Sequence, residues 1–319
     1  MSEKKISVVM SAYNEPERFL RESIESILNQ TCRDFEFIII QDKPDNEAIE
    51  RVVNEYAAKD DRIRFYKNEK NIGLAMSLNR GIELARYDII ARMDADDIAL
   101  PELLEKDLAF LTAHPEMHMV SVNYVCMDDD GATVTEARIR SLRNFGDIEK
   151  RMRHKNIVLH PGAMFYRKDF DGIGGYRNFP ASQDYDLWMR YITKGWQFAI
   201  LKDVLLKYRA TIKNTTYSKA LSQWVGEKYI KALFRERLKN GADSYSEETL
   251  KGLIQAAGGN DPKSIESYNE GRMLVFEGKK ALLGHEYVTC LSKLIKAFFS
   301  HKEMPSYIVR TIRAFLVDK

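Results

Sequence analysis

Three carboxylates fall within four residues, at Asp94, Asp96 and Asp97, directly after an apolar run at residues 88–93. Clustered like charges repel one another, so a compensating partner is expected nearby. A hard divalent cation such as Mg2+ or Mn2+ is suitable, because it takes carboxylate oxygens together with phosphate oxygens and water. One carboxylate on the metal and another on the ribose of a diphosphate ligand would use the cluster fully. The competing interpretation is a surface loop in which Asp96 or Asp97 caps the helix that begins near Pro101.

Strand and helix signals alternate through the residues that must position this cluster. Strands are expected at residues 6–11, 35–40, 63–66 and 88–93, and helices at residues 19–30, 48–58 and 74–85. This order predicts an α/β fold with a doubly wound, mostly parallel sheet and helices on both faces. Ligands bind such sheets beyond the carboxyl ends of the strands. Tyr13, Asp42 and the carboxylate cluster each follow a strand, so we expect them to meet at one edge.

The pattern loosens beyond Pro101 and becomes purely helical beyond about residue 212. We expect a helix at 103–113, strands at 119–127 and 158–166, a helix at 185–193 and an extended segment at 198–208. The later helices are expected at 218–238, 246–257, 262–277, 287–299 and 306–317. We therefore predict a catalytic domain over residues 1–212 and a helical C-terminal region over residues 213–319.

The composition of the 319-residue chain is that of an ordinary globular protein, with 45% hydrophobic and 30% charged residues. A formal net charge of +2 argues against a dedicated nucleic-acid binder. Cys32, Cys126 and Cys290 lie far apart, which favours reduced core thiols over a disulfide framework. The apolar run at residues 6–10 is too short for a signal peptide, and no run approaches the roughly 20 residues of a membrane span. We expect a cytoplasmic protein.

Several short segments, taken in order, resemble the family 2 glycosyltransferases, which have the GT-A fold. The resemblance covers roughly residues 5–210. Its segments are 8–15 (VVMSAYNE), 26–31 (SILNQT), 37–42 (FIIIQD), 71–74 (NIGL), 78–82 (LNRGI), 94–97 (DADD), 160–162 (HPG), 174–176 (GGY) and 183–188 (QDYDLW). The ordered set is specific, although no single segment is.

The resemblance implies a site for a nucleotide-sugar donor, with UDP as the expected nucleotide. Ser11 and Tyr13 would hold the nucleotide, with Tyr13 near the base, and Asp42 would accept a hydrogen bond from uracil. Matching positions of the same segments are Glu15, Asn71 and Gly73. Simple packing of Tyr13 and an Asx turn at Asp42 are the non-functional alternatives.

The resemblance also implies an inverting reaction that depends on Mn2+ or Mg2+. Asp94 would face the ribose and the metal, and Asp96 would bind the metal that bridges the two phosphates. Asp184 would be the general base that takes the acceptor's proton. Arg209 is a candidate second cation for the diphosphate, with a structural ion pair as its alternative.

Three positions depart from the family pattern. Gln41 replaces the commoner first aspartate of a pair, and Gln183 replaces the glutamate that usually precedes the base. A neutral Gln183 would ease the ionisation of Asp184. Thr211 stands where many relatives have a histidine, so this chain lacks the histidine that would be a third protein ligand for the metal.

Aromatic residues near the expected base allow two interpretations. Trp188 and Tyr185 are candidates for contact with sugar C–H groups, or core residues of a helix. His160 could line the donor or acceptor pocket, although a lone histidine at a strand is more often a satisfied structural residue.

The last part of the chain combines basic and apolar residues. Residues 289–319 contain six Lys or Arg and only two acidic residues, Glu303 and Asp318. Such helices can contact anionic lipid heads at the inner face of the plasma membrane, or pack on the protein and expose their lysines. The packed arrangement is slightly favoured.

The expected function is transfer of a sugar to a saccharide or lipid-linked acceptor in bacterial polysaccharide or glycolipid synthesis. The alternatives are a catalytically inert sugar-binding relative and a sugar-1-phosphate nucleotidyltransferase. The latter usually has a Gly-rich basic loop after the first strand, and residues 11–15 contain neither Gly nor a basic residue. A dinucleotide oxidoreductase is disfavoured because GxGxxG is absent there.

Overall fold

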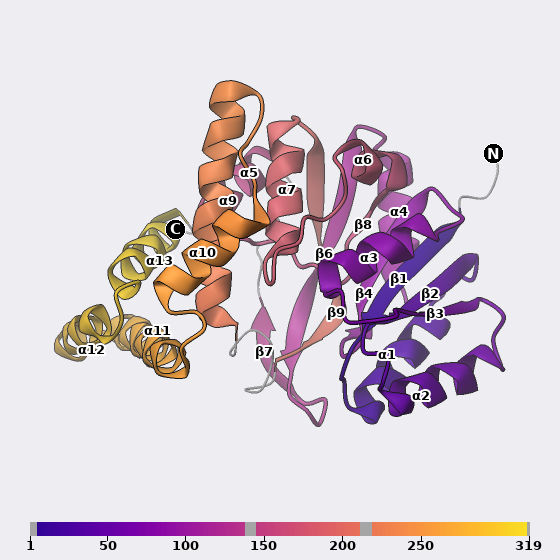
Figure 1. Cartoon of the computed structure of the whole chain (residues 1–319), viewed down its shortest axis with the longest axis horizontal. Coiled ribbons are helices and arrows are strands. Elements are labelled where there is room, and N and C mark those ends of the chain that lie inside the picture. Colours follow the sequence, from indigo (N-terminus) through magenta and orange to yellow (C-terminus); the bar gives the residue numbers. More distant parts are fainter. Residues whose placement is uncertain (1–4, 138–144, 211–218, 318–319) are drawn as a thin grey trace. The chain divides into compact units, whose positions relative to one another are not determined.

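The computed structural model describes residues 5–137, 145–210 and 219–317, and it divides into two compact units (Figure 1). The first unit comprises residues 1–149, 157–178 and 183–211. The second comprises residues 150–156, 179–182 and 212–319. Two short segments that the sequence places in the catalytic domain thus belong to the second unit.

The first unit is built on one mixed sheet, in which the described residues form nine strands. Their order is β3-β2-β1-β4-β8-β6-β9-β5, with β7 paired to β6. The strands are β1 (Ile6–Ala12), β2 (Phe35–Gln41), β3 (Ile63–Lys67), β4 (Ile89–Asp94), β5 (Ile98–Ala99), β6 (Met117–Met127), β7 (Thr133–Ala137), β8 (Met164–Tyr166) and β9 (Gln197–Arg209). β1 to β4 are mutually parallel, whereas β8 runs antiparallel to both β4 and β6.

Helices cover both faces of the parallel part of this sheet. Val8 and Met10 of β1 belong to one core with Leu20 and Ile24 of α1. Val9, which points the other way along the strand, lies against α3. The helices of this unit are α1 (Glu17–Leu28), α2 (Glu47–Ala57), α3 (Leu74–Glu83), α4 (Leu103–Ala113), α6 (Arg167–Gly172) and α7 (Gln183–Thr193). α5 (Phe145–Met152) begins in this unit and ends in the second.

The close approach of α3 to the sheet depends on Gly81. A Cβ atom at this position would lie 2.5 Å from Val9 Cγ1 and 3.3 Å from Ile40 Cγ1. Val9 is β-branched and sits in a central strand, so it has little freedom to move aside. Gly81 therefore sets how closely the helix packs.

We expect Gly81→Ala to destabilise the protein by about 1 kcal/mol in urea unfolding. Overpacking costs about 1–3 kcal/mol and outweighs the gain of about 0.5–1 kcal/mol from Ala in a helix. Gly252→Ala is the matched control, because Gly252 is an exposed helical glycine whose added Cβ would contact nothing within 4 Å. It should leave the protein equally stable or slightly more stable. Equal stabilisation by both substitutions would contradict this account.

The second unit is helical. Its helices are α9 (Ala220–Asn240), α10 (Glu247–Ala257), α11 (Pro262–Leu283), α12 (Tyr287–Ser300) and α13 (Met304–Val317). Two of the described helices, α10 and α11, begin at a side-chain cap: Ser246 accepts from Thr249 N, and Asp261 accepts from the amides of Lys263 and Ser264. No helix among the described residues has the length and apolar character needed to cross a bilayer.

The predicted α/β fold with a helical C-terminal region is confirmed. The strand expected at residues 158–166 is reduced to its last three residues, β8. Four short elements were not predicted: β5, β7, α5 and α6. The helix expected at 262–277 continues to Leu283.

Candidate active site

The carboxyl ends of β1, β2 and β4 bring the predicted residues to one edge of the sheet. Ser11 is in register with Ile40 on one side and with Asp94 on the other. Asp42, just past β2, donates its backbone N–H to Ala12 O at 2.8 Å. Parallel pairing from β1 to both neighbours is therefore what places Ser11, Asp42 and Asp94 together.

The side chains of Asp94, Asp96 and Asp97 form one acidic cluster, with a ligand atom from each lying within 4.8 Å of the others. Asp97 is fully buried, and its Oδ1 accepts the backbone N–H of Arg209 at 2.8 Å. Its Oδ2 is buried and accepts no hydrogen bond from the described residues. An all-oxygen donor set with one unsatisfied buried carboxylate oxygen fits Mg2+ or Mn2+.

Asp97 does not cap the following helix. The N-cap residue of α4 is Glu102, and it makes no side-chain capping bond. The interpretation of the cluster as a helix cap is therefore wrong for both Asp96 and Asp97.

Two members of the cluster, Asp96 and Asp97, have raised pKa values. Burial raises the pKa of Asp96 to about 7, and the charges of Asp94 and Glu15 add to the effect. Burial, followed by repulsion from Asp96 and Asp94, also raises the pKa of Asp97. Both causes penalise the charged form, which is the form that a cation would stabilise.

Arg92 is a partner of the cluster that the sequence reasoning missed. Its guanidinium forms an ion pair with Asp94 and is only 2% exposed. Its positive charge also acts on Asp96 and Asp97, where it lowers the pKa. An arginine inside an otherwise buried apolar strand was the available signal, because such a residue is almost never fully buried without a partner.

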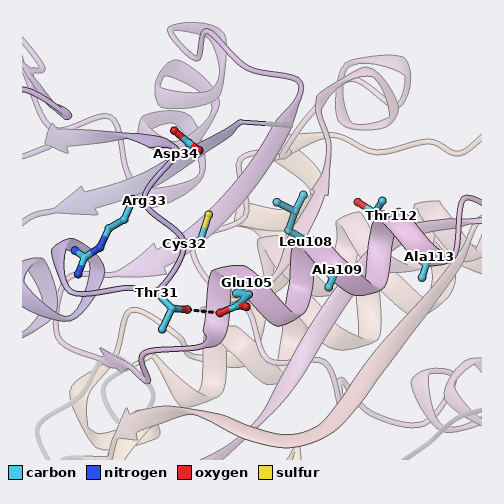
Figure 2. A pocket seen from close by; sticks show the side chains of 9 residues that line it. All are labelled: Thr31, Cys32, Arg33, Asp34, Glu105, Leu108, Ala109, Thr112 and Ala113. Atoms are coloured by element: carbon cyan, nitrogen blue, oxygen red, sulfur yellow. Dashed lines mark hydrogen bonds between the residues drawn. The ribbon is translucent and has the colours of Figure 1, made fainter. Parts of the chain in front are cut away.

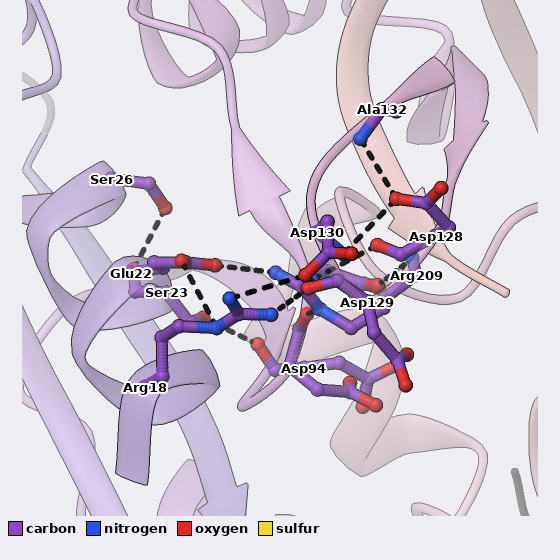
Figure 3. A network of polar contacts seen from close by, with 12 residues as sticks. Arg18, Glu22, Ser23, Ser26, Asp94, Asp128, Asp129, Asp130, Ala132 and Arg209 are labelled. Atoms are coloured by element: carbon purple, nitrogen blue, oxygen red, sulfur yellow. Dashed lines mark hydrogen bonds and ion pairs between the residues drawn. The ribbon is translucent and has the colours of Figure 1, made fainter. Parts of the chain in front are cut away.

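Arg209 is held by protein groups on every nitrogen (Figure 3). Its Nη2 contacts Glu22 Oε2 at 2.5 Å, and its Nε donates to Asp96 O at 2.8 Å. Its Nη1 donates to Asp128 O and Asp129 O at 3.1 and 3.0 Å. The guanidinium also stacks on Phe19, 3.9 Å from the ring centroid, and the residue is 1% exposed. These contacts favour the structural alternative: Arg209 ties the turn that carries the acidic cluster to α1 and to the β6–β7 hairpin.

The carboxylate of Asp42 orders the loop before α3. It accepts hydrogen bonds from Asn68 Nδ2 at 2.7 Å, Ile72 N at 2.9 Å and Gly73 N at 2.9 Å. Gly73 has a φ of +85°, a conformation that favours glycine, and Asn71 Oδ1 also accepts from its amide at 3.0 Å. Asp42 therefore makes no simple Asx turn; it fixes Asn71 and Gly73 beside the end of β2.

Gln41 has a role that an aspartate could not fill. Its side-chain Nε2 donates to Lys43 O at 2.7 Å and to Asn46 O at 2.9 Å, and the residue is fully buried. A carboxylate has no donor for these carbonyls. The departure from the family pattern at this position thus stabilises the loop that follows β2.

Tyr13 and Glu15 lie on the loop after β1. Tyr13 is 45% exposed, which is inconsistent with a purely packing role. Its backbone N–H donates to Glu15 Oε2 at 2.8 Å. Burial raises the pKa of Glu15, and the charge of Asp94 adds to the shift.

Asp184 lies in the first turn of α7 and is partly exposed. The N-terminus of a helix favours a carboxylate in its charged form. Gln183 before it is buried, and Asp186 after it is buried in an ion pair with Arg190 at 2.8 Å. Of the two aspartates in this turn, Asp184 is the one with access to solvent.

The buried Tyr176 is influenced by charges of both Asp184 and the acidic cluster. The charges of Arg92, Asp184 and Asp94 all act on the Tyr176 hydroxyl, whose pKa burial raises. This hydroxyl is 2.8 Å from His160 Nε2, and burial lowers the pKa of His160. His160 is therefore a satisfied structural residue, and Tyr176 is a second residue that the sequence reasoning missed.

Trp188 and Tyr185 are both fully buried, so they are core residues. Trp188 packs edge-on against Phe165 and Tyr191, with ring centroids 6.4 and 5.8 Å apart. The interpretation of these rings as sugar-facing is wrong. Thr211 lies outside the described residues, so the prediction that concerns a third metal ligand at this position stays a prediction from the sequence.

A separate hollow of about 640 Å3 lies between the α1–β2 loop and α4 (Figure 2). It contains none of the predicted site residues. Cys32 lines it, and burial raises the pKa of this thiol, which disfavours a reactive thiolate. Thr31 Oγ1 and Glu105 Oε2 close one side with a hydrogen bond of 2.6 Å.

Comparisons with known proteins agree with this geometry. The family model described as Glycosyl transferase family 2 matches residues 7–174. An uncharacterized glycosyltransferase of Methanocaldococcus jannaschii is 38% identical over 223 residues, which cover 70% of this chain and 77% of that protein. The amylovoran biosynthesis glycosyltransferase AmsE of Erwinia amylovora is 32% identical over 255 residues, which cover 78% and 91%.

The fold has a counterpart among solved structures. A crystal structure of S. aureus TarS 1-349 in complex with UDP-GlcNAc matches with a TM-score of 0.55 at 16% identity, covering 91% of this chain and 89% of that chain. At this identity the likeness concerns the fold alone. The protein is a glycosyltransferase with a GT-A fold. The chain belongs to glycosyl transferase family 2.

Proposed function

We propose that the protein is an inverting, metal-dependent glycosyltransferase that moves a sugar from a UDP-sugar to a saccharide or lipid-linked acceptor. The observation that carries this proposal is the acidic cluster at the end of β4, with its unsatisfied buried oxygen on Asp97. A structural cluster of three carboxylates would be expected to have its lone pairs satisfied by protein donors.

The nucleotide is assigned to the edge formed by β1 and β2. The exposed ring of Tyr13 is available to stack near the base. Asp42 already accepts three hydrogen bonds, and a carboxylate has about four acceptor sites, so one remains for the uracil N–H. Ser11, Asn71 and Gly73 would line the same edge.

The diphosphate is assigned to the acidic cluster. Asp96 and Asp94 would hold Mn2+ or Mg2+, which would supply positive charge where the departing diphosphate gains negative charge. Asp97 would support them from its buried position. Arg92 orients Asp94 through their ion pair, and Arg209 fixes the turn through the carbonyl of Asp96.

Asp184 is the proposed general base. Its carboxylate would take the proton from the acceptor hydroxyl as that oxygen attacks the anomeric carbon of the donor. The N-terminus of α7 and the neutral neighbour Gln183 both favour the ionised form that this step needs.

Metal affinity is expected to rise with pH between about 6 and 8. The pKa of Asp96 is raised to about 7, so a proton competes with the metal below that pH. Affinity for Mn2+ should fall by about tenfold for each pH unit below 7 and level off above 8.

The stability of the metal-free protein should change with pH in the opposite direction. Because folding penalises the ionised form of Asp96, the contribution of this residue to the free energy of unfolding declines as pH rises from about 4 to about 7.

Calorimetric titration with Mn2+ in two buffers of different ionisation enthalpy measures the released proton directly. Asp130→Asn, which removes an exposed carboxylate outside the cluster, is the control and should release the same proton as the wild type. Wild-type affinity that is constant from pH 6 to pH 8 would contradict the expected competition.

The biological setting proposed is synthesis of a bacterial polysaccharide or glycolipid. It is supported by the relative AmsE, whose name assigns it to amylovoran biosynthesis. A relative from Escherichia coli that is 28% identical over 206 residues is named UDP-Gal:alpha-D-GlcNAc-diphosphoundecaprenol beta-1,3-galactosyltransferase, which supports a UDP-sugar as donor.

A panel of UDP-sugars and other nucleotide sugars tests the proposal, with release of free nucleotide as the readout. We expect slow hydrolysis of one UDP-sugar in the presence of Mn2+ or Mg2+, abolished by EDTA and accelerated by the right acceptor. If no nucleotide sugar is bound or turned over, with or without a mixed acceptor pool, the catalytically inert relative becomes the better description.

A further inference from the structure

Helix α12 in the second unit has two apolar faces. One face is buried through Cys290 and Ala297 and packs on α11, where a Cβ on Gly278 would lie 3.5 Å from Leu294 Cδ2. The other face is exposed: Val288 is 85% exposed, Leu291 61% and Phe299 79%. A helix that is apolar all round is normally buried all round.

The exposed residues form one stripe rather than isolated contacts with solvent. The exposed positions follow one another at intervals of three or four residues, which places them on one side of the helix; only the last two are adjacent. They are positions 288, 291, 295, 298 and 299. All five are large and apolar, and each is at least 47% exposed. We call this set the α12 stripe. A contiguous exposed apolar surface of this kind marks an interaction site more often than chance.

The charge around the stripe selects the kind of partner. Residues 287–317 contain five basic residues and one acidic residue, Glu303. Of the basic residues, Lys293 is paired with Glu277 of α11 at 2.5 Å, and the exposed Glu286 precedes the helix. Glu303 is already paired with Lys228 at 2.5 Å. Lys296 and Arg313 are exposed, and Lys296 lies beside the stripe on the same helix. The surface is therefore complementary to an anionic partner.

A second copy of this chain is a poor occupant. An isologous dimer through the α12 stripe would bring the same basic residues of both copies together, and like charges in an interface are unfavourable. The side chains also project outward as a ridge on the helix. Such a ridge, with aromatic rings and flanking lysines, suits insertion between lipid head groups, where the helix lies in the plane of the interface.

We propose that the α12 stripe docks the protein on an anionic lipid surface. The apolar side chains enter the boundary between head groups and acyl chains, and Lys296 with its basic neighbours contacts the lipid phosphates. This function goes beyond sugar transfer and does not depend on it, because the acidic cluster, Asp42 and Asp184 take no part.

Vesicle co-sedimentation of the full chain tests the proposal. Vesicles of phosphatidylcholine mixed with phosphatidylglycerol should bind the protein, and vesicles of phosphatidylcholine alone should bind it at least about tenfold more weakly. The triple substitution Val288→Ser, Leu291→Ser and Phe299→Ser should weaken binding to the anionic vesicles by at least about tenfold. Lys296→Glu alone should weaken it several-fold, and salt should do the same.

The matched control is Leu253→Ser on α10, which removes an apolar side chain that is 41% exposed but lies outside the stripe. It should bind anionic vesicles as the wild type does. Unchanged UDP-sugar hydrolysis by every variant shows that the protein is folded; if the wild type has no such activity, its circular dichroism serves instead. Three outcomes overturn the proposal: equal binding to both vesicle types, full binding by the triple variant, or a wild-type dimer that the triple substitution converts to a monomer.

Discussion

Asp184→Asn is expected to lower turnover by about 100- to 10,000-fold, the range that general-base catalysis contributes. The amide keeps the shape of the side chain but cannot take a proton from the acceptor hydroxyl. The position is partly exposed at the start of α7, so the substitution should not disturb the core. Steady-state kinetics with saturating donor and acceptor measure kcat, and UDP-sugar titration measures donor affinity separately.

The expected pattern is a large loss in kcat with donor affinity within about twofold of wild type. Asp171→Asn is the matched control, because Asp171 is an exposed aspartate on α6 whose carboxylate lies 3.5 Å from Arg167 Nε. Its kcat should equal that of wild type. If the Asp184→Asn variant has the kcat of the wild type, Asp184 is not the general base.

Asp96→Asn is expected to reduce turnover by about a thousandfold through a different route. A bound divalent cation contributes several kcal/mol to stabilisation of charge on a leaving group, and about 4 kcal/mol corresponds to about a thousandfold in rate. An amide at this position cannot neutralise the cation, and it leaves two carboxylates in place of three. The apparent affinity for Mn2+, measured by titration of activity, should fall with the rate.

Asp130→Asn is the matched control for this substitution. Asp130 lies on the β6–β7 hairpin in the same polar network (Figure 3), its side chain is 90% exposed, and it contacts Arg18 at 3.5 Å. It should retain wild-type rate and metal affinity. Residual activity of Asp96→Asn that is insensitive to EDTA would be consistent with loss of the metal site, whereas full activity that EDTA still abolishes would place the metal elsewhere.

The parallel part of the sheet could be predicted because its signals are local. β1 and β2 are buried along their whole length and consist mainly of apolar residues, and each ends at a polar turn. α4 was predicted to the residue. β5 could not be, because it has two residues and exists only through pairing with β9. The strand expected at residues 158–166 failed for a similar reason: β8 is held only where it meets β4 and β6.

The residues of the candidate site likewise divide into those that local sequence signals predict and those that they do not. Asp94, Asp96 and Asp97 are visible in the sequence because their spacing follows a strand signal. The environment of Arg209 is not, because its carboxylate partner Glu22 lies 187 residues away. The anchoring of Asp42 to Ile72 and Gly73 likewise crosses about 30 residues of sequence. The hydrogen-bond and ion-pair partners of a charged side chain are set by tertiary packing, so they cannot be predicted from residue types and local spacing alone.

The central claim is that the edge formed by β1, β2 and β4 binds a nucleotide diphosphate through a metal at the acidic cluster. Titration of the wild-type protein with UDP, with Mn2+ present and again with EDTA, tests this most directly. The account predicts saturable binding with Mn2+ and at least about tenfold weaker binding with EDTA. Equal UDP affinity under both conditions would contradict it.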